Sequence, residues 1–218
     1  MMLEDNYRHR GLRKKLVRIV EGKGITDQNV LSALKKVPRH YFFDKAFLEH
    51  AYQDKAFPIG EGQTISQPFT VAFQTQLLNI QKGDKVLEIG TWSGYQACIL
   101  MEMGAEVYTI EYIKKLYNRT KKFLPVMGYK PHFFLGDGTN GLPAFAPYDK
   151  IIITAAAPTL PKPLIDQMRV GGIMVIPVGD NNMQRMVKAT KKNETKVSKE
   201  YFDYFSFVPL VGKFGWRK

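Results

Sequence analysis

The sequence predicts an α/β fold with a doubly wound, mostly parallel sheet, and three observations support this. Short apolar strands alternate with helical segments over residues 68–176, as in parallel β–α–β units. The stretch KVLEIGTWSG at 85–94 runs from an apolar strand through a glycine turn into a helix. Segments 183–191 and 196–209 have the pattern of two antiparallel strands, which we expect at one end of the sheet.

The N-terminal part of the chain is predicted to be mostly helical and to form an elaboration ahead of the sheet. Apolar residues recur at helical spacing over 7–21. A second helix, capped by Thr26 or Asp27, is expected to end before Pro38. A third short helical segment is expected over 45–51.

The core elements are expected to follow in regular order. A helix begins at Pro68, and Pro125 ends or bends a later helix. The pair Gly171-Gly172 is predicted to turn into the last parallel strand. The expected strands cover 86–89, 106–110, 132–135, 151–153 and 173–176, and the expected helices begin near 95 or cover 112–127 and 160–168.

Length and composition are consistent with a single domain. The chain has 218 residues, of which 44% are hydrophobic and 24% charged, as in ordinary globular proteins. We expect one domain over 1–218, made of a helical elaboration (1–60), a core (61–180) and antiparallel end strands (181–218). The single cysteine, Cys98, lies in an apolar helix and is expected to be a buried small hydrophobe.

The net charge of +12 permits an acidic partner, nucleic acid included. The basic residues are scattered along the chain, however, and no block resembles a recognition helix or a basic tail. No long apolar run indicates a membrane span, and the first residues contain no apolar segment typical of a secretory signal. We therefore expect a cytoplasmic monomer that binds neither membrane nor nucleic acid.

The glycine turn after the central strand indicates which cofactor binds there. The dinucleotide pattern G-x-G-x-x-G fails, because Trp92 and Tyr95 occupy the positions of its second and third glycines. The pattern E-x-G-x-x-x-G is present as Glu88, Gly90 and Gly94. This resembles the first motif of class I S-adenosylmethionine-dependent methyltransferases, so the sheet is expected to be the Rossmann-like methyltransferase sheet.

Two further strand ends carry acidic residues. Glu111 lies 111 − 90 = 21 positions after Gly90, a spacing at which a carboxylate can accept both ribose hydroxyls. Asp137 follows the third strand, where the methyltransferases have an acidic residue that contacts adenine. Taken singly, each feature is more often a plain turn or a solvated carboxylate. Together they predict the cofactor-binding set Glu88, Gly90, Thr91, Ser93, Gly94, Glu111, Asp137 and Gly138 for S-adenosyl-L-methionine.

Trp92 departs from the methyltransferase motif, which usually has glycine at this point. The indole either crowds the cofactor or points outward.

A second motif is more specific. The chain resembles the protein-L-isoaspartate O-methyltransferase family over nearly its whole length. The discriminating piece is the loop GQTISQP at 62–68. The other matching pieces are VPRH at 37–40, VLEIGTWSGYQA at 86–97, GDG at 136–138, YDKIIITAAAP at 148–158, VGGIMVIPVG at 170–179 and FVPL at 207–210.

The resemblance implies transfer of a methyl group to the α-carboxylate of L-isoaspartyl residues in damaged proteins and peptides. The methyl ester then closes to a succinimide, which reopens partly to aspartate. Ser66 resembles the active-site serine of the family, and Thr64 is expected to add a second hydrogen-bond donor. The resemblance assigns the peptide substrate to Ile65 and to Val208, Pro209 and Leu210, whose main chain is expected to pair with it.

Several alternatives stay open at this point. Without the resemblance, Ser66 is more simply a cap for the helix at Pro68. His40 has no partner at metal-ligand spacing, so a structural role and no metal site are expected. An RNA methyltransferase is the second candidate function, although an N-P-P-Y-type motif is absent at 154–158. A non-catalytic protein of the same fold is the third, and Trp92 is its only support.

Overall fold

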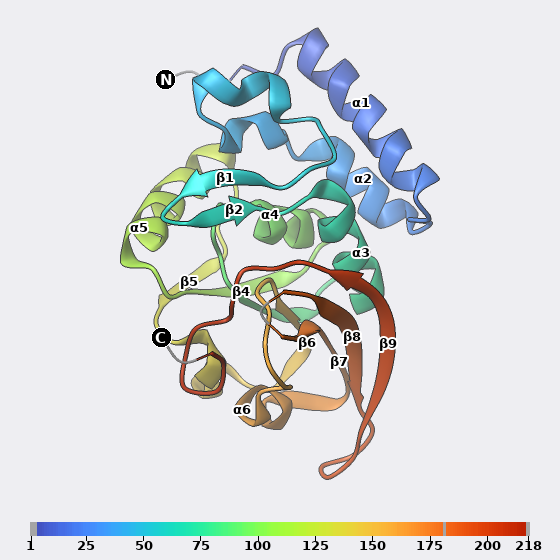
Figure 1. Ribbon diagram of the computed structural model, residues 1–218, viewed down its shortest axis with the longest axis vertical. Helices are drawn as coiled ribbons and strands as arrows, with labels where there is room; N and C mark the ends of the chain where they lie inside the picture. The colour runs from blue at the N-terminus through green and yellow to red at the C-terminus, as the bar shows by residue number, and fades with distance from the viewer. Residues whose placement is uncertain (1–3, 181, 217–218) are drawn as a thin grey trace.

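The computed structural model describes residues 4–180 and 182–216, and a seven-stranded sheet forms its centre (Figure 1). The strand order is β5-β4-β3-β6-β7-β8-β9. β3 to β7 are parallel, whereas β8 and β9 are antiparallel to their neighbours. This confirms the predicted doubly wound sheet with an antiparallel end. The strands are β3 (Lys85–Ile89), β4 (Glu106–Glu111), β5 (His132–Leu135), β6 (Tyr148–Ile153), β7 (Met168–Gly179), β8 (Gln184–Lys191) and β9 (Val197–Phe205).

The order of winding reverses beside β3. β4 and β5 follow on one side of β3, and the chain then returns to place β6 and β7 on the other side. Open α/β sheets bind ligands outside the carboxyl ends of their strands at such a switch point. A ligand is therefore expected at the turns that follow β3, β4, β5 and β6.

The helices agree with the sequence pattern in most places. Asp27, not Thr26, caps the second helix, because its carboxylate accepts hydrogen bonds from the backbone N–H groups of Asn29 and Val30. Pro125 marks the point where the helix predicted over 112–127 changes to a tighter 3-10 turn. The α-helices are α1 (Tyr7–Gly22), α2 (Gln28–Lys36), α3 (Pro68–Leu78), α4 (Tyr95–Glu102), α5 (Lys114–Phe123) and α6 (Lys162–Asp166), and the 3-10 helices are η1 (Arg39–Phe42), η2 (Lys45–His50), η3 (Leu124–Met127), η4 (Gly138–Asn140) and η5 (Pro143–Phe145).

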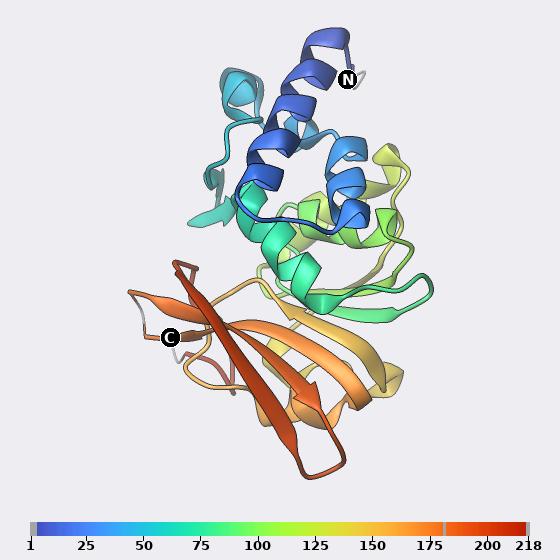
Figure 2. The same cartoon turned by 90° about the vertical axis from the view of Figure 1, so that its right-hand side faces the viewer.

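Apolar layers cover both faces of the sheet. Figure 2 shows the helices of the N-terminal half gathered on one side of the strands. Successive residues of a strand point to opposite faces. Val86 of β3 packs in the layer that holds buried residues of α1 to α4, and its neighbour Leu87 packs in the opposite layer with Leu164 of α6. The strands are thus buried on both sides, as parallel strands are.

Some boundaries differ from the predictions. A small antiparallel hairpin, β1 (Phe57–Gly60) with β2 (Gln63–Ile65), forms where only a polar loop was expected. β7 begins at Met168 and includes Gly171-Gly172, because an irregularity in its pairing with β6 absorbs them. β9 ends at Phe205, after which the chain crosses the sheet edge and Pro209 bridges to Ala156.

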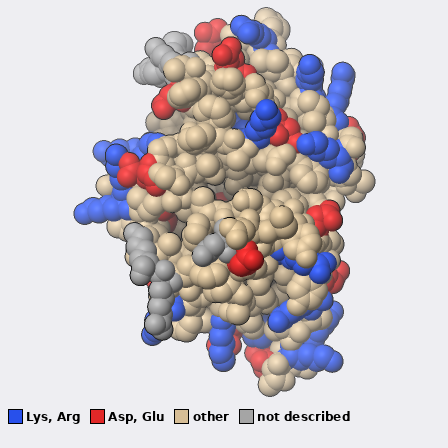
Figure 3. Space-filling model, viewed as in Figure 1, with Lys and Arg blue, Asp and Glu red and all other residues tan. Residues whose placement is uncertain are grey.

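Lysine and arginine side chains are spread over the face shown in Figure 3 and do not form one cluster there. The same face is hollowed near its middle. None of the helices among the described residues is long and apolar enough to cross a membrane.

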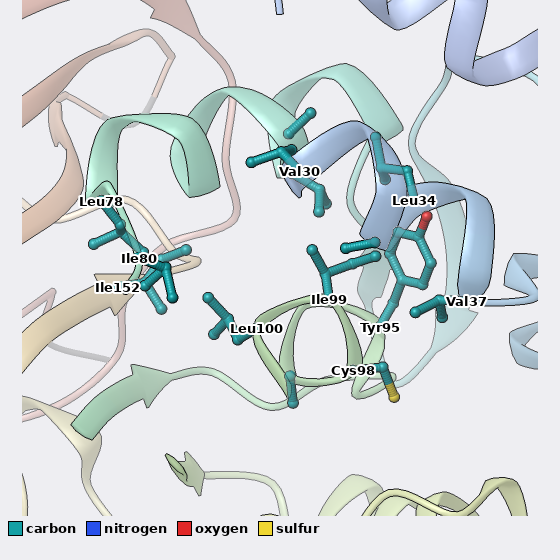
Figure 4. Packing of buried hydrophobic residues seen from close by; sticks show 14 of the residues in the cluster. Val30, Leu34, Val37, Leu78, Ile80, Tyr95, Cys98, Ile99, Leu100 and Ile152 are labelled. Carbon is teal, nitrogen blue, oxygen red and sulfur yellow. The ribbon is translucent and has the colours of Figure 1, made fainter. Parts of the chain in front are cut away.

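The core around α4 fixes the glycine turn that precedes this helix (Figure 4). Tyr95, Ile99 and Leu100 of α4 are almost completely buried and belong to one cluster with residues of α2 and α3. Cys98 is also fully buried, and burial raises the pKa of its thiol well above the usual value. This agrees with its predicted role as a small hydrophobe rather than a nucleophile.

Candidate active site

A cavity of about 300 Å³ opens at the carboxyl ends of the strands. Its wall includes Gly90 after β3, Glu111 at the end of β4, Gly138 after β5 and Ala155 after β6. We call it the strand-edge pocket. Four different strand ends thus converge on one space, as the sequence predicted for three of them.

Gly90 brings the backbone close to this pocket. Its φ is +95°, a conformation that side chains rarely adopt. A Cβ atom at this position would lie 2.4 Å from Nε1 of Trp92 and 2.5 Å from Oγ1 of Thr154. Gly94, with φ +85°, caps α4, and a Cβ atom there would meet side chains of the helix packed beside it. A side chain at either position would strain the backbone and meet neighbouring atoms, so both positions require glycine.

Glu111 presents its carboxylate to the strand-edge pocket. Oε2 accepts a hydrogen bond of 2.8 Å from the backbone N–H of Trp92, and Oε1 accepts one of 2.8 Å from Ile113. Burial raises the pKa of the carboxyl, while these backbone N–H groups act in the opposite direction. The backbone N–H of Tyr112 also lowers the pKa of this carboxyl. The carboxylate, which has about four acceptor positions, is thus held in place and keeps acceptor capacity for a ribose hydroxyl.

Glu88, Thr91 and Ser93 lie behind the turn and not in the wall of the strand-edge pocket. Oε2 of Glu88 accepts a hydrogen bond of 2.5 Å from Thr109, and Oε1 has no partner among the described residues. Complete burial raises the pKa of Glu88 to about 8. The Ser93 hydroxyl accepts a bond from the N–H of Tyr95. These residues support the turn from beneath.

The carboxylate of Asp137 accepts hydrogen bonds from its own turn and from the C-terminal segment. Oδ1 accepts hydrogen bonds from the N–H and the hydroxyl of Thr139, and Oδ2 accepts one of 2.8 Å from the N–H of Lys213. The next residue, Gly138, lines the strand-edge pocket. The carboxylate of Asp137 thus holds the turn in position while its neighbour faces the cavity.

A second cavity, of about 790 Å³, lies between the loop after the β1–β2 hairpin and the segment after β9. We call it the hairpin pocket. Its wall includes Thr64, Ser66, Thr154 and Val208. Within the described chain the hydroxyls of Thr64 and Ser66 make no hydrogen bond, so both remain available to a ligand. Ile65, between them, points into the core and is 1% exposed.

Ser66 does not cap α3. The N-cap residue is Gln67, and its own side chain makes no capping bond. The carboxylate of Asp54 caps the helix instead. It accepts a hydrogen bond of 2.8 Å from the backbone N–H of Phe69 and another from the side-chain amide of Gln67. The Ser66 hydroxyl therefore does not act as a helix cap, which was the alternative considered from the sequence.

Arg39 holds the Ser66 loop and was missed by the sequence analysis, which considered only its neighbour His40. The Arg39 side chain is 0% exposed, and Nη2 donates a hydrogen bond of 2.9 Å to the carbonyl of Ser66. Its guanidinium lies 4.8 Å from the ring centre of Tyr95. Burial lowers its pKa to about 10, so it stays charged at neutral pH. Arg39 and Ser66 are 27 positions apart in the chain, so no local sequence pattern reveals this contact.

The segment after β9 forms a wall shared by the two pockets. The N–H of Leu210 donates to the carbonyl of Ala156 over 2.7 Å, and the N–H of Ala156 donates to Val208 over 2.8 Å. Pro209, between them, lines both pockets, whereas Leu210 lines only the strand-edge pocket. The predicted substrate residues Val208, Pro209 and Leu210 therefore stand at the boundary.

Trp92 is the other residue in the walls of both pockets. Its indole points inward, since Nε1 donates a hydrogen bond of 2.7 Å to Oγ1 of Thr154. Of the two orientations considered from sequence, the inward one is observed. The indole occupies the space in front of Gly90.

His40 lies away from both pockets, beside Asp5 and His9, and these three could together offer ligand atoms to a metal. Nδ1 of His40 lies 2.7 Å from the Tyr52 hydroxyl, and Nε2 lies 3.0 Å from the carbonyl of Glu4. The carboxylate of Asp5 forms an ion pair with Arg13. Both His40 nitrogens and the carboxylate are thus engaged, which supports a structural role.

A pocket at the switch point of a doubly wound sheet, faced by a carboxylate at the second strand end, is typical of nucleotide cofactor sites. The E-x-G-x-x-x-G turn at 88–94, in place of the dinucleotide pattern, indicates the class of S-adenosylmethionine-dependent methyltransferases. A family model described as Protein-L-isoaspartate(D-aspartate) O-methyltransferase (PCMT) matches residues 11–215. The chain belongs to this family of enzymes.

Curated relatives and solved structures agree with this family assignment. A protein of Cytophaga hutchinsonii named protein-L-isoaspartate O-methyltransferase is 59% identical, covering 99% of this chain and 97% of its own. One of Christiangramia forsetii with the same name is 53% identical, covering 96% and 98%. A solved structure with that name has a TM-score of 0.83 at 28% identity, covering 93% of this chain and 67% of the other. The fold also matches a Plasmodium falciparum structure in complex with S-adenosyl-L-homocysteine, with a TM-score of 0.78, 24% identity, and coverage of 95% and 99%.

Proposed function

We propose that this enzyme transfers the methyl group of S-adenosyl-L-methionine to the α-carboxylate of L-isoaspartyl residues in damaged proteins and peptides. The observation that supports this most strongly is the adjacency of the two pockets. The strand-edge pocket carries the Glu111 carboxylate, the hairpin pocket carries the free hydroxyls of Thr64 and Ser66, and Trp92 and Pro209 lie between them.

The strand-edge pocket would hold the cofactor. In this proposal Glu111 accepts the ribose hydroxyls, and the backbone at Gly90 and Gly138 allows the cofactor to approach closely. Glu88, Thr91, Ser93, Gly94 and Asp137 complete the proposed cofactor set, and they act mainly by fixing the turns. When bound, S-adenosyl-L-methionine supplies a methyl group on a sulfonium leaving group.

The hairpin pocket would hold the acceptor carboxylate. A carboxylate is already ionised at neutral pH, so its oxygen needs no general base. The hydroxyls of Ser66 and Thr64 donate hydrogen bonds that orient it and replace lost hydration. The carboxylate oxygen forms a bond to the methyl carbon while the carbon–sulfur bond breaks, which leaves a methyl ester and a neutral thioether. No proton is transferred.

The segment at Val208–Leu210 would hold the substrate peptide through its main chain, and Ile65 would support the loop from the core. Main-chain pairing reads no side chains, so many sequences around the damaged site would be accepted.

We further propose that the whole chain, 1–218, acts as one domain and as a monomer in the cytoplasm, without nucleic acid as a partner. The scattered basic residues on the face in Figure 3 support a solvated surface rather than an RNA-binding one.

Incubation with labelled S-adenosyl-L-methionine and either an isoaspartyl peptide or structured RNA tests this proposal. We expect label in the peptide only, as an ester that mild base removes. Label in RNA alone would refute the proposed acceptor and support the second candidate function.

A further inference from the structure

Trp92 combines a backbone held on both sides with an indole that makes one hydrogen bond among the described residues and packs at the edge of the core. Its φ of +49° is unusual for a residue with a side chain. The backbone is held by its N–H on Glu111, at 2.8 Å, and by its carbonyl, which accepts from the Thr120 hydroxyl at 2.7 Å. Among the described residues the indole makes one hydrogen bond, from Nε1 to Oγ1 of Thr154. A change of rotamer would break this hydrogen bond and the packing of the ring, but it would leave the two backbone hydrogen bonds of the turn in place.

The indole lies where a ligand would approach the glycine turn. A Cβ atom on Gly90 would be 2.4 Å from Nε1 and 3.0 Å from Cε2 of Trp92. Glycine at this kind of turn normally lets a ligand come close to the backbone. Here the indole occupies that approach.

The ring also separates the two pockets. Gly90, against which it packs, lines the strand-edge pocket, and Thr154, to which it is bonded, lines the hairpin pocket. Methyl transfer requires the acceptor oxygen and the methyl carbon to lie in line at near contact. No side chain can stand between them, so the ring as observed closes the passage.

We propose that the Trp92 indole is a gate between the two pockets: it rests closed against Gly90, latched to Thr154, and swings toward the hairpin pocket when the methionine part of the cofactor binds. The hairpin pocket, at about 790 Å³, has room for it. This inference rests on the proposed function, because it assumes that the cofactor binds in the strand-edge pocket. Opening would make the acceptor site competent only after the cofactor is in place.

Intrinsic fluorescence reports the movement directly. The chain contains two tryptophans, Trp92 and Trp216, so a spectrum of Trp92→Phe isolates the contribution of the second. Titration with S-adenosyl-L-homocysteine should change the emission of the unmodified protein and leave that of Trp92→Phe nearly constant. Calorimetry gives the concentration of S-adenosyl-L-homocysteine that saturates the protein. If the emission of Trp92 is unchanged at that concentration, the indole does not move on binding, and the gate is overturned.

Removing the latch should strengthen binding. In Thr154→Val the indole loses its hydrogen-bond acceptor, and the carbonyls of Ile89 and Gly90 lose the hydroxyl that donates to them. Trp92→Phe removes the same latch and leaves the Thr154 hydroxyl on these carbonyls, so a gain in both variants assigns the effect to the latch. One neutral hydrogen bond corresponds to about fivefold in an equilibrium. We expect S-adenosyl-L-homocysteine to bind Thr154→Val about fivefold more tightly by calorimetry. Thr70→Val is the matched control, since Thr70 lines the hairpin pocket and makes no hydrogen bond to Trp92 in the described structure. The affinity of Thr70→Val for S-adenosyl-L-homocysteine should be unchanged.

The outcomes separate the gate from the proposed function. Binding to the unmodified protein, with no gain in Thr154→Val and none in Trp92→Phe, would refute the gate and leave the function standing. Absence of binding to the unmodified protein, Thr154→Val and Trp92→Gly would refute the cofactor assignment itself. Binding to Trp92→Gly alone would make the indole a permanent block, which contradicts both.

Discussion

The strand-edge pocket and the hairpin pocket are assembled in different ways. The first has its centre at the ends of four neighbouring parallel strands, which the sheet places, and Glu61, Gln63 and the segment 209–211 close it. The second is made from the Ser66 loop, the segment after β9 and Thr154, which only tertiary packing brings together. Sheet topology therefore fixes most of the strand-edge pocket, whereas the hairpin pocket depends on supports such as Arg39 and Asp54. Substitutions in each pocket should therefore have separable effects.

The largest effect is expected from Gly90→Val, which should disable the strand-edge pocket. Its side chain would meet Trp92 and Thr154 and would strain a backbone with φ +95°. We expect calorimetry to show at least about 100-fold weaker binding of S-adenosyl-L-homocysteine, or about 2.7 kcal/mol.

Gly83→Val is the control for backbone strain, because Gly83 has φ +88° and open space around it. It should lose stability but keep its affinity. Equal loss of affinity in the two variants would mean that the strand-edge pocket is not where the cofactor binds.

Ser66→Ala should disable only the hairpin pocket. Loss of one preoriented donor in an active site typically costs about 100-fold in turnover. We expect about that fall in kcat/KM for an isoaspartyl peptide, with the affinity for S-adenosyl-L-homocysteine unchanged. Ser206→Ala, in the same pocket wall, is the matched control and should remain active. Full activity of Ser66→Ala would contradict the assigned role.

Glu88→Gln tests the buried floor behind the glycine turn. The pKa of Glu88 is about 8 in the folded protein and 4.5 in its ordinary environment, so between these values the folded state keeps a proton that the unfolded state releases. Stability therefore falls as the pH rises through this range and levels off above it. Between pH 6 and pH 8 the variant should lose about 2 kcal/mol less stability than the unmodified protein.

Urea unfolding at several pH values measures this difference. Parallel pH profiles for the two proteins would show that Glu88 titrates normally, and its burial would then have no energetic consequence.

Arg39→Met should loosen the hairpin pocket indirectly and have the smallest effect. The variant removes the hydrogen bond to the Ser66 carbonyl while keeping an apolar side chain in the core. We expect kcat/KM to fall about tenfold, the equivalent of one hydrogen bond to a charged group. The affinity for S-adenosyl-L-homocysteine should not change. Reduced cofactor affinity together with reduced turnover would indicate general unfolding instead.

The two pockets also differ in how far the sequence predicts them. Glu111 and Gly138 could be placed because strand ends in a parallel sheet meet at one edge, whatever the details of packing. Asp137 follows the correct strand, yet its carboxylate binds Lys213, a contact between positions 76 apart that no local pattern reveals. The same limit hid Arg39 and Asp54 and left the direction of the Trp92 ring open, because side-chain orientation depends on tertiary neighbours.

Methyl transfer to two matched peptides, one with isoaspartate and one with aspartate at the same position, tests the central claim most directly. We expect a base-labile ester in the isoaspartyl peptide and none in the aspartyl peptide. The reason is that the hairpin pocket must present an α-carboxylate at its boundary with the strand-edge pocket. Equal labelling of both peptides, or labelling of the aspartyl peptide alone, would contradict it.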